Sequence, residues 1–266
     1  MGMEDLAIRA AVPEDHKEIE AVSEESWEGS DYVPGVLDRW LKQENGELSV
    51  AELDGRIVGF SHLSVLCPGY GWLEGARVHP QWRRKGVAVA LAKYHMERAR
   101  EMGLKKLGMA TGSKNVASQG VVLRLGFELA GSYSIYRAEP RQGKAPQVGA
   151  VEHLPEGNGL IAAGWTFWPW SRELLEKWRS QGKVFGCGDA GMVLHRGARS
   201  NRANIALLWG PDSDVSVLLE YALSQPPEVE RISYMSADDK YKQQLLAAGF
   251  ELREGKALVY LLDLTG

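Results

Sequence analysis

The sequence predicts an α/β fold in which a mixed central sheet is flanked by helices, and it predicts this arrangement twice. Asp54-Gly55 separates two strand-like segments, which is typical of a two-residue hairpin. Over residues 73–103 an apolar strand runs into a basic, glycine-bearing loop and a long helix. Gly126-Phe127-Glu128-Leu129 then recurs as Gly249-Phe250-Glu251-Leu252, which indicates duplication.

The first half of the chain supplies one complete set of elements. Its predicted strands are 6–9, 48–53, 56–63, 72–78 and 106–111. Its predicted helices are 13–27, 36–41, 87–103 and 115–125. Pro13 suits a first helical turn and Gly103 a C-terminal cap. A helix separates the last two strands, so we expect them to be parallel, and residues 127–138 should provide the closing strands.

The second half repeats this order. We predict a hairpin over 183–195, strands at 204–210, 229–235 and 257–262, and helices at 214–223 and 240–248. Residues 139–146 are rich in proline, glycine and charge, which is typical of a linker. The expected organisation is therefore a catalytic domain at 1–139, a linker at 140–150 and a second, degenerate domain at 151–266.

The loop that precedes the long helix has the chemistry of a phosphate site. Helix N-termini leave about four backbone N–H groups without partners and carry a partial positive charge. Gly86 lets the backbone approach a ligand, small Ala88 keeps the first turn open, and Arg83, Arg84 and Lys85 add cations. The alternative is a solvated basic turn. The loop carries neither a Gly-Lys-Ser/Thr sequence nor a Gly-x-Gly-x-x-Gly fingerprint, which excludes the common nucleotide motifs.

The run Arg83-Arg84-Lys85-Gly86-Val87-Ala88 resembles the coenzyme A loop of the GNAT superfamily of N-acetyltransferases, whose pattern is Arg/Gln-x-x-Gly-x-Gly/Ala. Asn115-Val116-Ala117-Ser118 resembles the family's next helix, and Gly126-Phe127 the start of its last hairpin. The resemblance covers approximately residues 4–139 and implies the acyl-CoA N-acyltransferase fold with acetyl-CoA as co-substrate. The cofactor contacts it implies are Arg77, Val78, Arg83, Arg84, Lys85, Gly86, Val87, Ala88, Asn115 and Ser118. Asn115 can alternatively be a helix N-cap.

The second half lacks the cofactor loop. Gly210-Pro211-Asp212-Ser213-Asp214 follows its apolar strand, and two carboxylates at this place repel a pyrophosphate. We therefore expect the second domain to bind no coenzyme A and to shape or cover the substrate cleft of the first.

The resemblance also assigns catalytic roles. In the family the amine attacks the thioester directly, and a backbone N–H at the end of the fourth strand, here Val78, polarises the carbonyl. Gly75 is consistent with the family's bulge in that strand. Glu74 matches a glutamate that many members use to accept the proton of the amine, directly or through water. The alternative for Glu74 is a solvent-facing strand carboxylate.

The proton donor to the leaving thiolate is less defined. The tyrosine that many relatives carry before the Gly-Phe pair is Val122 here. Ser118, Tyr133 or Tyr136 can take its place, or solvent can protonate the thiolate.

Substrate contacts are expected in the loop between the first two helices. Trp27, Glu28, Asp31 and Tyr32, together with Glu74, offer aromatic walls and carboxylates that suit an ammonium group. The segments 30–34 and 38–41 resemble amino-acid acetyltransferases related to histidine N-acetyltransferase.

The composition excludes several other classes. A formal net charge of −4 over 266 residues argues against a general nucleic-acid or membrane-surface binder. No apolar run approaches the ~18 residues needed to cross a bilayer. Two distant cysteines and six histidines show no metal-ligand spacing, so we expect no metal and a cytoplasmic location.

Three functions remain open. The first is acetyl-CoA-dependent N-acetylation of a small primary amine, with an amino acid as the favoured acceptor, by a monomer or homodimer. The second is the same chemistry on a peptide or protein amine. The third is a non-catalytic acyl-CoA-binding regulator, which the valine at position 122 favours.

Overall fold

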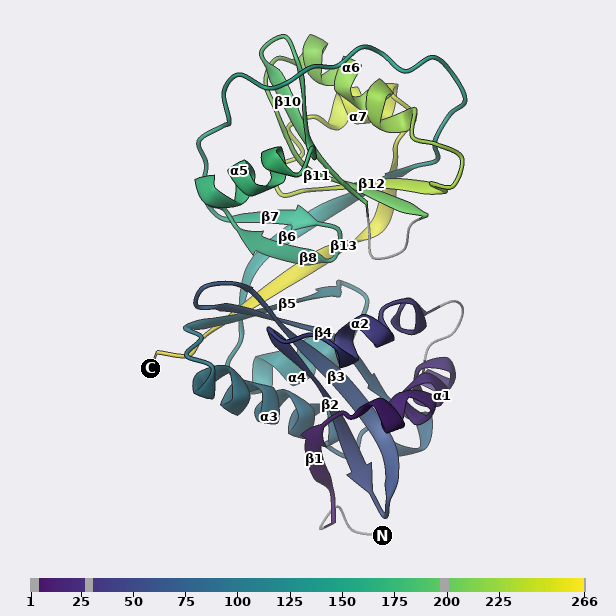
Figure 1. The fold of residues 1–266 in the computed structure, drawn as a ribbon, viewed down its shortest axis with the longest axis vertical. Coiled ribbons are helices and arrows are strands. Elements are labelled where there is room, and N and C mark those ends of the chain that lie inside the picture. The colour runs from purple at the N-terminus through teal and green to yellow at the C-terminus, as the bar shows by residue number, and fades with distance from the viewer. Residues whose placement is uncertain (1–4, 27–30, 197–200, 266) are drawn as a thin grey trace. The chain divides into compact units, whose positions relative to one another are not determined.

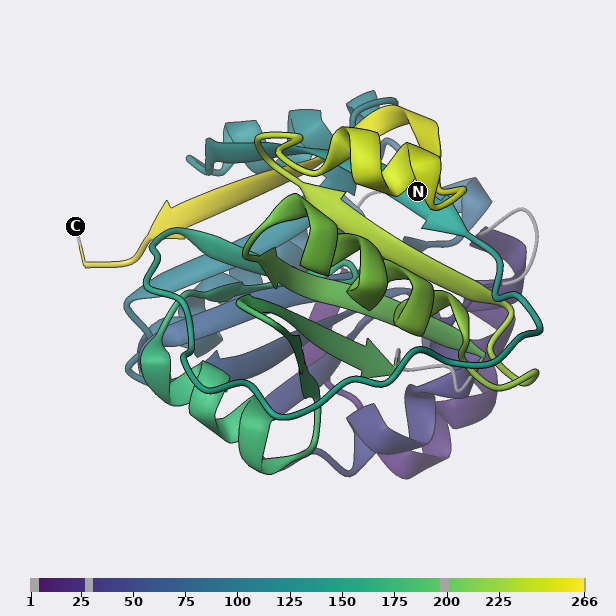
Figure 2. The same ribbon diagram turned by 90° about the horizontal axis from the view of Figure 1, so that it is seen from above.

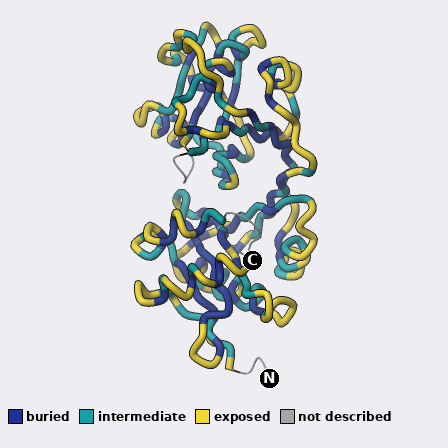
Figure 3. The backbone as a smooth tube through the Cα atoms, turned by 90° about the vertical axis from the view of Figure 1, so that its right-hand side faces the viewer, coloured by how far each residue is buried: buried dark blue, intermediate teal, exposed yellow. Residues whose placement is uncertain are grey.

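The computed structural model describes residues 5–26, 31–196 and 201–265, and it divides into two compact units. The first unit is Met1–Thr111, Asn115–Ala130 and Val259–Gly266, and the second is Gly112–Lys114 and Gly131–Leu258. Each unit has its own buried backbone segments (Figure 3). This division differs from the expected boundary after residue 139, because residues 131–150 belong to the second unit.

The first unit contains the elements predicted for it (Figure 1). Its strands are β1 (Ala7–Ala10), β2 (Gly46–Leu53), β3 (Arg56–Cys67), β4 (Tyr70–Val78) and β5 (Lys106–Gly112). Its α-helices are α1 (His16–Ser26), α2 (Leu37–Leu41), α3 (Val87–Glu101) and α4 (Val116–Arg124). Short 3-10 turns precede three of them, at Pro13–Asp15, Val33–Gly35 and Pro80–Trp82.

The pairing of these strands follows the sequence prediction. β1 to β4 are successively antiparallel, whereas β5 runs parallel to β4 after the α3 crossover. Asp54 and Gly55 both have positive φ (51° and 73°), the geometry of the tight turn that Asp-Gly favours. The predicted hairpin and the predicted parallel pair are therefore both confirmed.

Helices cover both faces of this sheet. On one face, Ile19 of α1 and Leu37 and Trp40 of α2 pack with Val50 and Phe60. On the other face, apolar residues of α3 pack against the strands, with a cluster formed by Ala51, Leu53, Val58, Val87 and Leu91. Val87 is almost completely buried, so its side chain anchors the first turn of α3 and fixes the position of the basic loop before it.

The second unit repeats much of this order. Its strands and helices are β7 (Leu160–Ala163), β8 (Thr166–Pro169), α5 (Arg172–Ser180), β9 (Val184–Cys187), β10 (Ala190–Arg196), β11 (Arg202–Trp209), α6 (Asp212–Leu223), β12 (Arg231–Ser236) and α7 (Lys242–Ala247). β9, β10 and β11 are antiparallel neighbours, and β12 is parallel to β11 after the α6 crossover. Apolar residues of α6 and α7 pack on one face of these strands, and those of α5 and β7 on the other (Figure 2).

The closing strands differ from the prediction. A hairpin was expected over 127–138, but β6 (Glu128–Ala138) is one continuous strand, and its residues 134–138 pair antiparallel with β12 in the second unit. The place next to β5 in the first unit is taken instead by the end of β13 (Glu251–Asp263). Leu264 N–H donates to the Lys105 carbonyl in that unit (2.8 Å). Each unit is thus completed by a strand from the opposite half of the sequence.

The segment expected to be a linker is hydrogen-bonded to the second unit. Arg141 N–H donates to the Leu223 carbonyl (2.8 Å), and Gly149 and Gly186 exchange two backbone hydrogen bonds (2.8 and 2.9 Å). A proline-, glycine- and charge-rich composition predicts an irregular backbone, but it does not exclude an ordered one that is paired with its neighbours.

Three elements were not predicted: the β7–β8 hairpin and α5. The tryptophan-rich stretch at 165–170 contains β8, where Trp168 packs edge-on against Trp178 of α5 (6.0 Å) and Phe167 against Tyr133 (4.8 Å). These aromatic residues therefore contribute to the interior of the second unit. Short strands bounded by glycine and proline carry too few alternating positions to be recognised from periodicity alone.

Each unit contains a histidine, buried His95 in the first and half-buried His195 in the second, that should make the protein less stable in acid. Burial lowers the pKa of His95 on α3 to about 4, opposed by the Ser61 carbonyl. Burial, with a smaller effect of Lys183, lowers the pKa of His195 on β10 to about 4. The unfolded chain binds these protons near pH 6.5, so each histidine should remove about 1.4 kcal/mol of stability per pH unit as the pH falls from there toward 4.

Urea titrations between pH 7 and pH 4.5 measure this slope. His95→Gln and His195→Gln should each reduce it by about one proton per molecule unfolded. His153→Gln, at an exposed position, serves as the control. An unchanged slope in both the His95 and the His195 variant would show that other groups cause the acid sensitivity.

Candidate functional site

The strands β4 and β5 separate part of the way along their length. Their parallel pairing joins Tyr70–Leu73 to Lys106–Met109 and ends there, while β4 continues from Glu74 to Val78. The far half of β4 therefore has β3 on one side only. Such a split between parallel strands leaves backbone groups of the strand directed at the opening, where an extended ligand can pair with them.

A bulge at Gly75 shapes this half of β4. Phe60 pairs with Arg77 and His62 with Glu74, so β4 has one more residue than β3 between these two pairs. Gly75 has φ +68°, and a Cβ there would lie 2.5 Å from the ring of Trp40. The predicted bulge is confirmed, and the position requires glycine because both the backbone conformation and the space exclude a side chain.

The amide of Val78 points into the opening. His79 N–H donates to the Val58 carbonyl (3.0 Å), which makes residues 58 and 79 a hydrogen-bonded antiparallel pair. Gly59 and Val78, the next pair, are then a non-hydrogen-bonded pair whose N–H and C=O groups point away from each other. The Val78 N–H accordingly faces the side on which β5 has separated, where it can donate to a ligand's carbonyl oxygen.

The loop before α3 fits a diphosphate. Gly86 caps the helix with φ +94° and no side-chain hydrogen bond to the first amides, and Arg84 also has positive φ (62°). A Cβ at Gly86 would meet no described atom within 4 Å, so the space in front of the amides is open. Residues 83–86 are exposed, and alternating positive φ values turn successive N–H groups toward one concave side.

The three cations of the loop have different surroundings. The Arg83 guanidinium donates to the carbonyls of Val78 (3.3 Å) and Ser26 (2.6 Å), so it ties the loop to the end of β4 and to α1. The Lys85 ammonium lies over the Trp82 ring, 4.2 Å from its centroid. Because the Arg83 and Lys85 side chains are both engaged in these contacts, the Arg84 side chain is the one best placed to reach a phosphate. Arg83 instead holds the loop in its conformation.

Glu74 lies in a cluster with two side chains of the neighbouring strand. Ser64 Oγ donates to Glu74 Oε1 (3.0 Å), and His62 Nδ1 lies 3.4 Å from the same oxygen. Ser64 Oγ is also 3.3 Å from His62 Nδ1. Glu74 is 22% exposed and His62 is fully buried. The partly exposed Glu74 carboxylate is therefore oriented by two more deeply buried side chains, His62 and Ser64.

Burial favours the neutral form of His62 in this cluster. Burial lowers the pKa of His62, although Glu74 acts in the opposite direction. Its ring stacks on Trp40 (4.4 Å between centroids, 9° between planes), the same ring that fills the space beside Gly75. The packing of Trp40 thereby fixes both the bulge and the imidazole. Sequence analysis did not identify His62, Ser64 or Trp40, although strand alternation places His62 and Ser64 on one face of β3.

Asp31 is committed to an internal ion pair. Arg77 Nε and Nη2 donate to its two carboxylate oxygens (2.9 and 2.7 Å), and Ser23 Oγ donates as well (2.6 Å). Burial alone would raise the pKa of Asp31, but Arg77 and Ser23 outweigh it and the pKa lies below its usual range. The Arg77 guanidinium is consequently directed at Asp31, so this ion pair joins Asp31 to β4 and the expected contact of Arg77 with the cofactor is not supported by its orientation.

Breaking this pair should cost more stability than any surface substitution. The Asp31 and Arg77 side chains are 4% and 9% exposed. Asp31→Ala leaves a buried guanidinium uncompensated, so the free energy of unfolding should fall by about 3–5 kcal/mol. Asp38→Ala, whose carboxylate is 81% exposed beside His16, should change it by less than about 0.5 kcal/mol. Urea unfolding measures both; equal effects would contradict the structural role of Asp31.

The other predicted substrate contacts are only partly described. Trp27 and Glu28 lie outside the described residues. Tyr32 packs edge-on against Trp40 (6.0 Å) and under the Arg77 guanidinium (5.6 Å). Tyr32, Trp40, His62 and Glu74 thus form one continuous aromatic and acidic group on the face covered by α1 and α2.

The candidate proton donors are divided between the units. Asn115 Oδ1 accepts from Ser118 N–H (3.1 Å), so Asn115 caps α4, as one of its two expected roles requires. Ser118 is half-buried in the first unit. Tyr133 belongs to the second unit, where burial raises its pKa, and the hydroxyl of Tyr136 donates to Asp239 (2.8 Å). Val122 is buried in the first unit.

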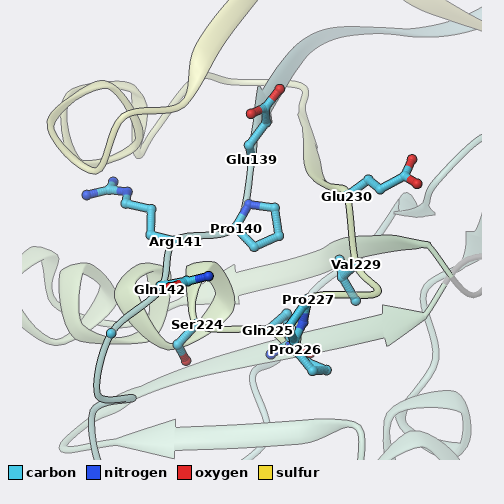
Figure 4. A pocket seen from close by; sticks show the side chains of 11 residues that line it. Glu139, Pro140, Arg141, Gln142, Ser224, Gln225, Pro226, Pro227, Val229 and Glu230 are labelled. Carbon is cyan, nitrogen blue, oxygen red and sulfur yellow. The ribbon is translucent and has the colours of Figure 1, made fainter.

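One cavity lies within the second unit. It has a volume of about 630 Å³ and is lined by residues 139–143 and by the turn between α6 and β12 (Figure 4). A second cavity of about 200 Å³ lies where β11 and β12 separate, with Tyr133 in its wall. Neither cavity is lined by Glu74, by Val78 or by the loop before α3.

The second unit presents acidic groups where the first has its basic loop. Asp212 and Asp214 stand in the first turn of α6. Asp212 accepts from Gln244 (2.7 Å) and Asp214 from the Asp189 amide (3.2 Å). Within the described chain, no helix is long and apolar enough to cross a membrane, and no three acidic, histidine or cysteine side chains are grouped to hold a metal ion.

Comparison with known proteins agrees with this geometry. Residues 13–127 match the sequence profile of the "Acetyltransferase (GNAT) family". Histidine N-acetyltransferase of Scomber australasicus is 36% identical over 93 residues, which are 35% of this chain and 28% of the relative. Probable N-acetyltransferase 16 of Homo sapiens is 30% identical over 92 residues, 34% of this chain and 25% of the relative. The chain thus spans about a quarter of the length of these relatives.

Solved structures match over nearly the whole chain. A GCN5-related N-acetyltransferase from Sphaerobacter thermophilus has a TM-score of 0.70 and covers 99% of this chain and 97% of its own, at 12% identity. A structure from Thermoplasma acidophilum has a TM-score of 0.71 with 97% and 99% coverage, at 19% identity. At these identities the matches establish the fold, which includes both units.

Proposed function

We propose, because residues 13–127 match the profile of the acetyltransferase (GNAT) family, that the chain is an acetyl-CoA-dependent N-acetyltransferase acting on the primary amine of a small molecule. The observation that carries the proposal is the convergence of three features at one strand end. A basic loop with an uncapped helix N-terminus precedes α3, an amide points into the β4–β5 split, and a positioned carboxylate stands on the same strand.

The residues of the first unit divide the work of holding the cofactor. The amides of residues 86–88 and the Arg84 side chain hold the diphosphate, and the far half of β4 pairs with the extended arm. Bound acetyl-CoA supplies the thioester whose acetyl group is transferred. The Val78 N–H donates to the thioester oxygen and stabilises the negative charge that develops there.

Glu74 prepares the acceptor. An amine is mostly protonated near neutral pH, and only its neutral form attacks a carbonyl. Glu74 Oε2, the oxygen that Ser64 does not contact, accepts the proton directly or through water. His62 and Ser64 keep the carboxylate aimed, and neutral His62 adds no positive charge that would repel the ammonium. The thiolate takes a proton from Ser118 or from solvent.

We take free amino acids as the acceptor class. The support is the similarity of about a third of the chain to histidine N-acetyltransferases of Scomber australasicus, Oreochromis niloticus and Xenopus tropicalis, which are named for an amino-acid acceptor. Tyr32 and Trp40 form an aromatic wall that suits a small cationic acceptor. The second unit, with acidic groups at α6, serves as a degenerate copy that binds no coenzyme A.

An acceptor panel tests the proposal. Thiol release from acetyl-CoA is followed with a thiol reagent in the presence of free amino acids, the same amino acids with a blocked amino group, and short peptides. Release that requires a free amino group on an amino acid supports the proposal. Faster turnover of peptides would move the acceptor class to peptides, and coenzyme A binding without amine-dependent release would make the chain a binding protein.

A further inference from the structure

Four arginines lie on neighbouring strands of the second unit. They are Arg137 on β6, Arg202 on β11, Arg231 on β12 and Arg253 on β13, and we call them the arginine cluster. None of them was singled out in the sequence, because they are separated by up to 116 positions, the difference between 253 and 137.

The register places three of these side chains on one face. Arg202 and Arg231 are directly paired in the parallel β11–β12 ladder. Arg137 is paired with Ser233, which is two positions from Arg231 and therefore on the same face of β12. β13, which carries Arg253, is the neighbour of β6 on the other side. The opposite face, with Ala138, Ala203 and Ile232, is packed in the core under α6 and α7.

The charges around Arg137 are predominantly positive. Burial lowers the pKa of Arg137, and Arg231, Arg253 and Arg202 lower it further. Among the described residues, neither Arg137 nor Arg231 has a carboxylate oxygen within the 4 Å of an ion pair. Three acids adjoin the cluster: Glu251 lies 3.9 Å from Arg253 and is 79% exposed, Glu230 precedes Arg231 and accepts from Asn201 (2.8 Å), and Glu139 follows Ala138 at the end of β6.

Like charges at neighbouring positions repel and destabilise the folded state. Burial strengthens this repulsion at half-buried Arg137, because less water screens it. The guanidinium groups of Arg137 and Arg231 keep their charge at ordinary pH, so an anion bound beside them would relieve the repulsion. Guanidinium groups also form paired hydrogen bonds to carboxylate and phosphate oxygens, which suits them to a ligand that carries several such oxygens.

We propose that the arginine cluster of the second unit is a binding site for a small polyanion, a molecule that bears two or more phosphate or carboxylate charges. The proposal is independent of acetyl transfer, because every residue of the arginine cluster lies in the second unit and none is among the residues to which acetyl transfer is assigned. It assigns the degenerate copy a ligand of its own, on a different set of residues from those of the lost cofactor loop.

Calorimetric titration of the full chain tests this, with inorganic phosphate and citrate as separate probes at constant ionic strength and without coenzyme A. Binding of either probe should weaken by about tenfold in Arg231→Gln and in Arg137→Gln, the loss expected for a charged hydrogen bond. Arg179→Gln removes the same charge from exposed α5, where Arg179 pairs with Glu176, and should leave binding unchanged.

The same variants make a second, opposite prediction for the unliganded protein. Arg231→Gln and Arg137→Gln should raise the thermal unfolding midpoint in chloride buffer, because they relieve repulsion, and should reduce the rise that phosphate or citrate causes. A preference for phosphate identifies phosphate esters as the ligand class, and a preference for citrate identifies polycarboxylates. Equal stabilisation by chloride at the same ionic strength, or binding unchanged in both variants, would overturn the proposal.

Discussion

Replacing Glu74 by glutamine is expected to reduce kcat by about a hundredfold to ten-thousandfold, the contribution typical of a positioned general base. Affinity for acetyl-CoA should not change, because Glu74 is not among the residues assigned to the cofactor. The amide oxygen of glutamine can still accept from Ser64 Oγ, so the cluster of Glu74, His62 and Ser64 keeps its shape. The variant removes the proton acceptor alone, so the loss should appear in kcat.

The measurement is a pH–rate profile with a good amine acceptor. In the variant the acid limb that reports loss of the base should disappear, while the calorimetric affinity for coenzyme A stays at its original value. Glu52→Gln is a matched control, because it makes the same change on β2 at a glutamate that pairs with Arg9. A variant at Glu74 with an unchanged profile would remove this residue from the mechanism.

Gly86→Glu is expected to abolish binding of coenzyme A. The substitution puts a side chain at φ +94°, which costs about 1–2 kcal/mol for an L-residue, and it adds a negative charge at the amides that should receive a diphosphate. No described atom obstructs the new Cβ, so the protein should still fold. Calorimetric titration with coenzyme A measures the loss directly.

Gly103→Glu provides the matched control at the other end of the same helix. Gly103 also has positive φ (71°) and open space around its Cβ, so the substitution imposes similar strain and the same charge. The two variants should lose similar stability, but only Gly86→Glu should lose coenzyme A binding. Retained affinity in Gly86→Glu, or equal loss in both, would place the cofactor elsewhere.

Local features of the first unit were predictable because short-range chemistry determines them. Asp54-Gly55 can adopt two successive positive φ values at little cost, so it specifies a hairpin wherever apolar strands flank it. Gly86 before an apolar helix similarly specifies an open helix N-terminus. The order of strand, helix and strand then makes β4 and β5 parallel. The loop, the bulge at Gly75 and the position of Glu74 all follow from this stretch of sequence.

Long-range partners were not predictable from the same reasoning. Asp31 was expected to bind an ammonium group, but a buried guanidinium 46 positions away takes both of its oxygens. The support of Glu74 by His62 depends on the register across a bulged strand pair, and a shift of one residue reverses the face of every side chain. The arginine cluster forms only because β13, β6, β12 and β11 are neighbours in this order, and that order cannot be read from the sequence pattern. Periodicity reports which face is apolar, but it does not identify the neighbour.

The exchange of closing strands has a consequence for how the chain is made. During synthesis β5 emerges more than 100 residues before the segment that covers its free edge, because that segment lies at the end of β13. An uncovered edge pairs readily with other strands. Residues 1–130 by themselves should therefore be prone to associate, and the sheet of the first unit can be completed only after residue 263 has been added.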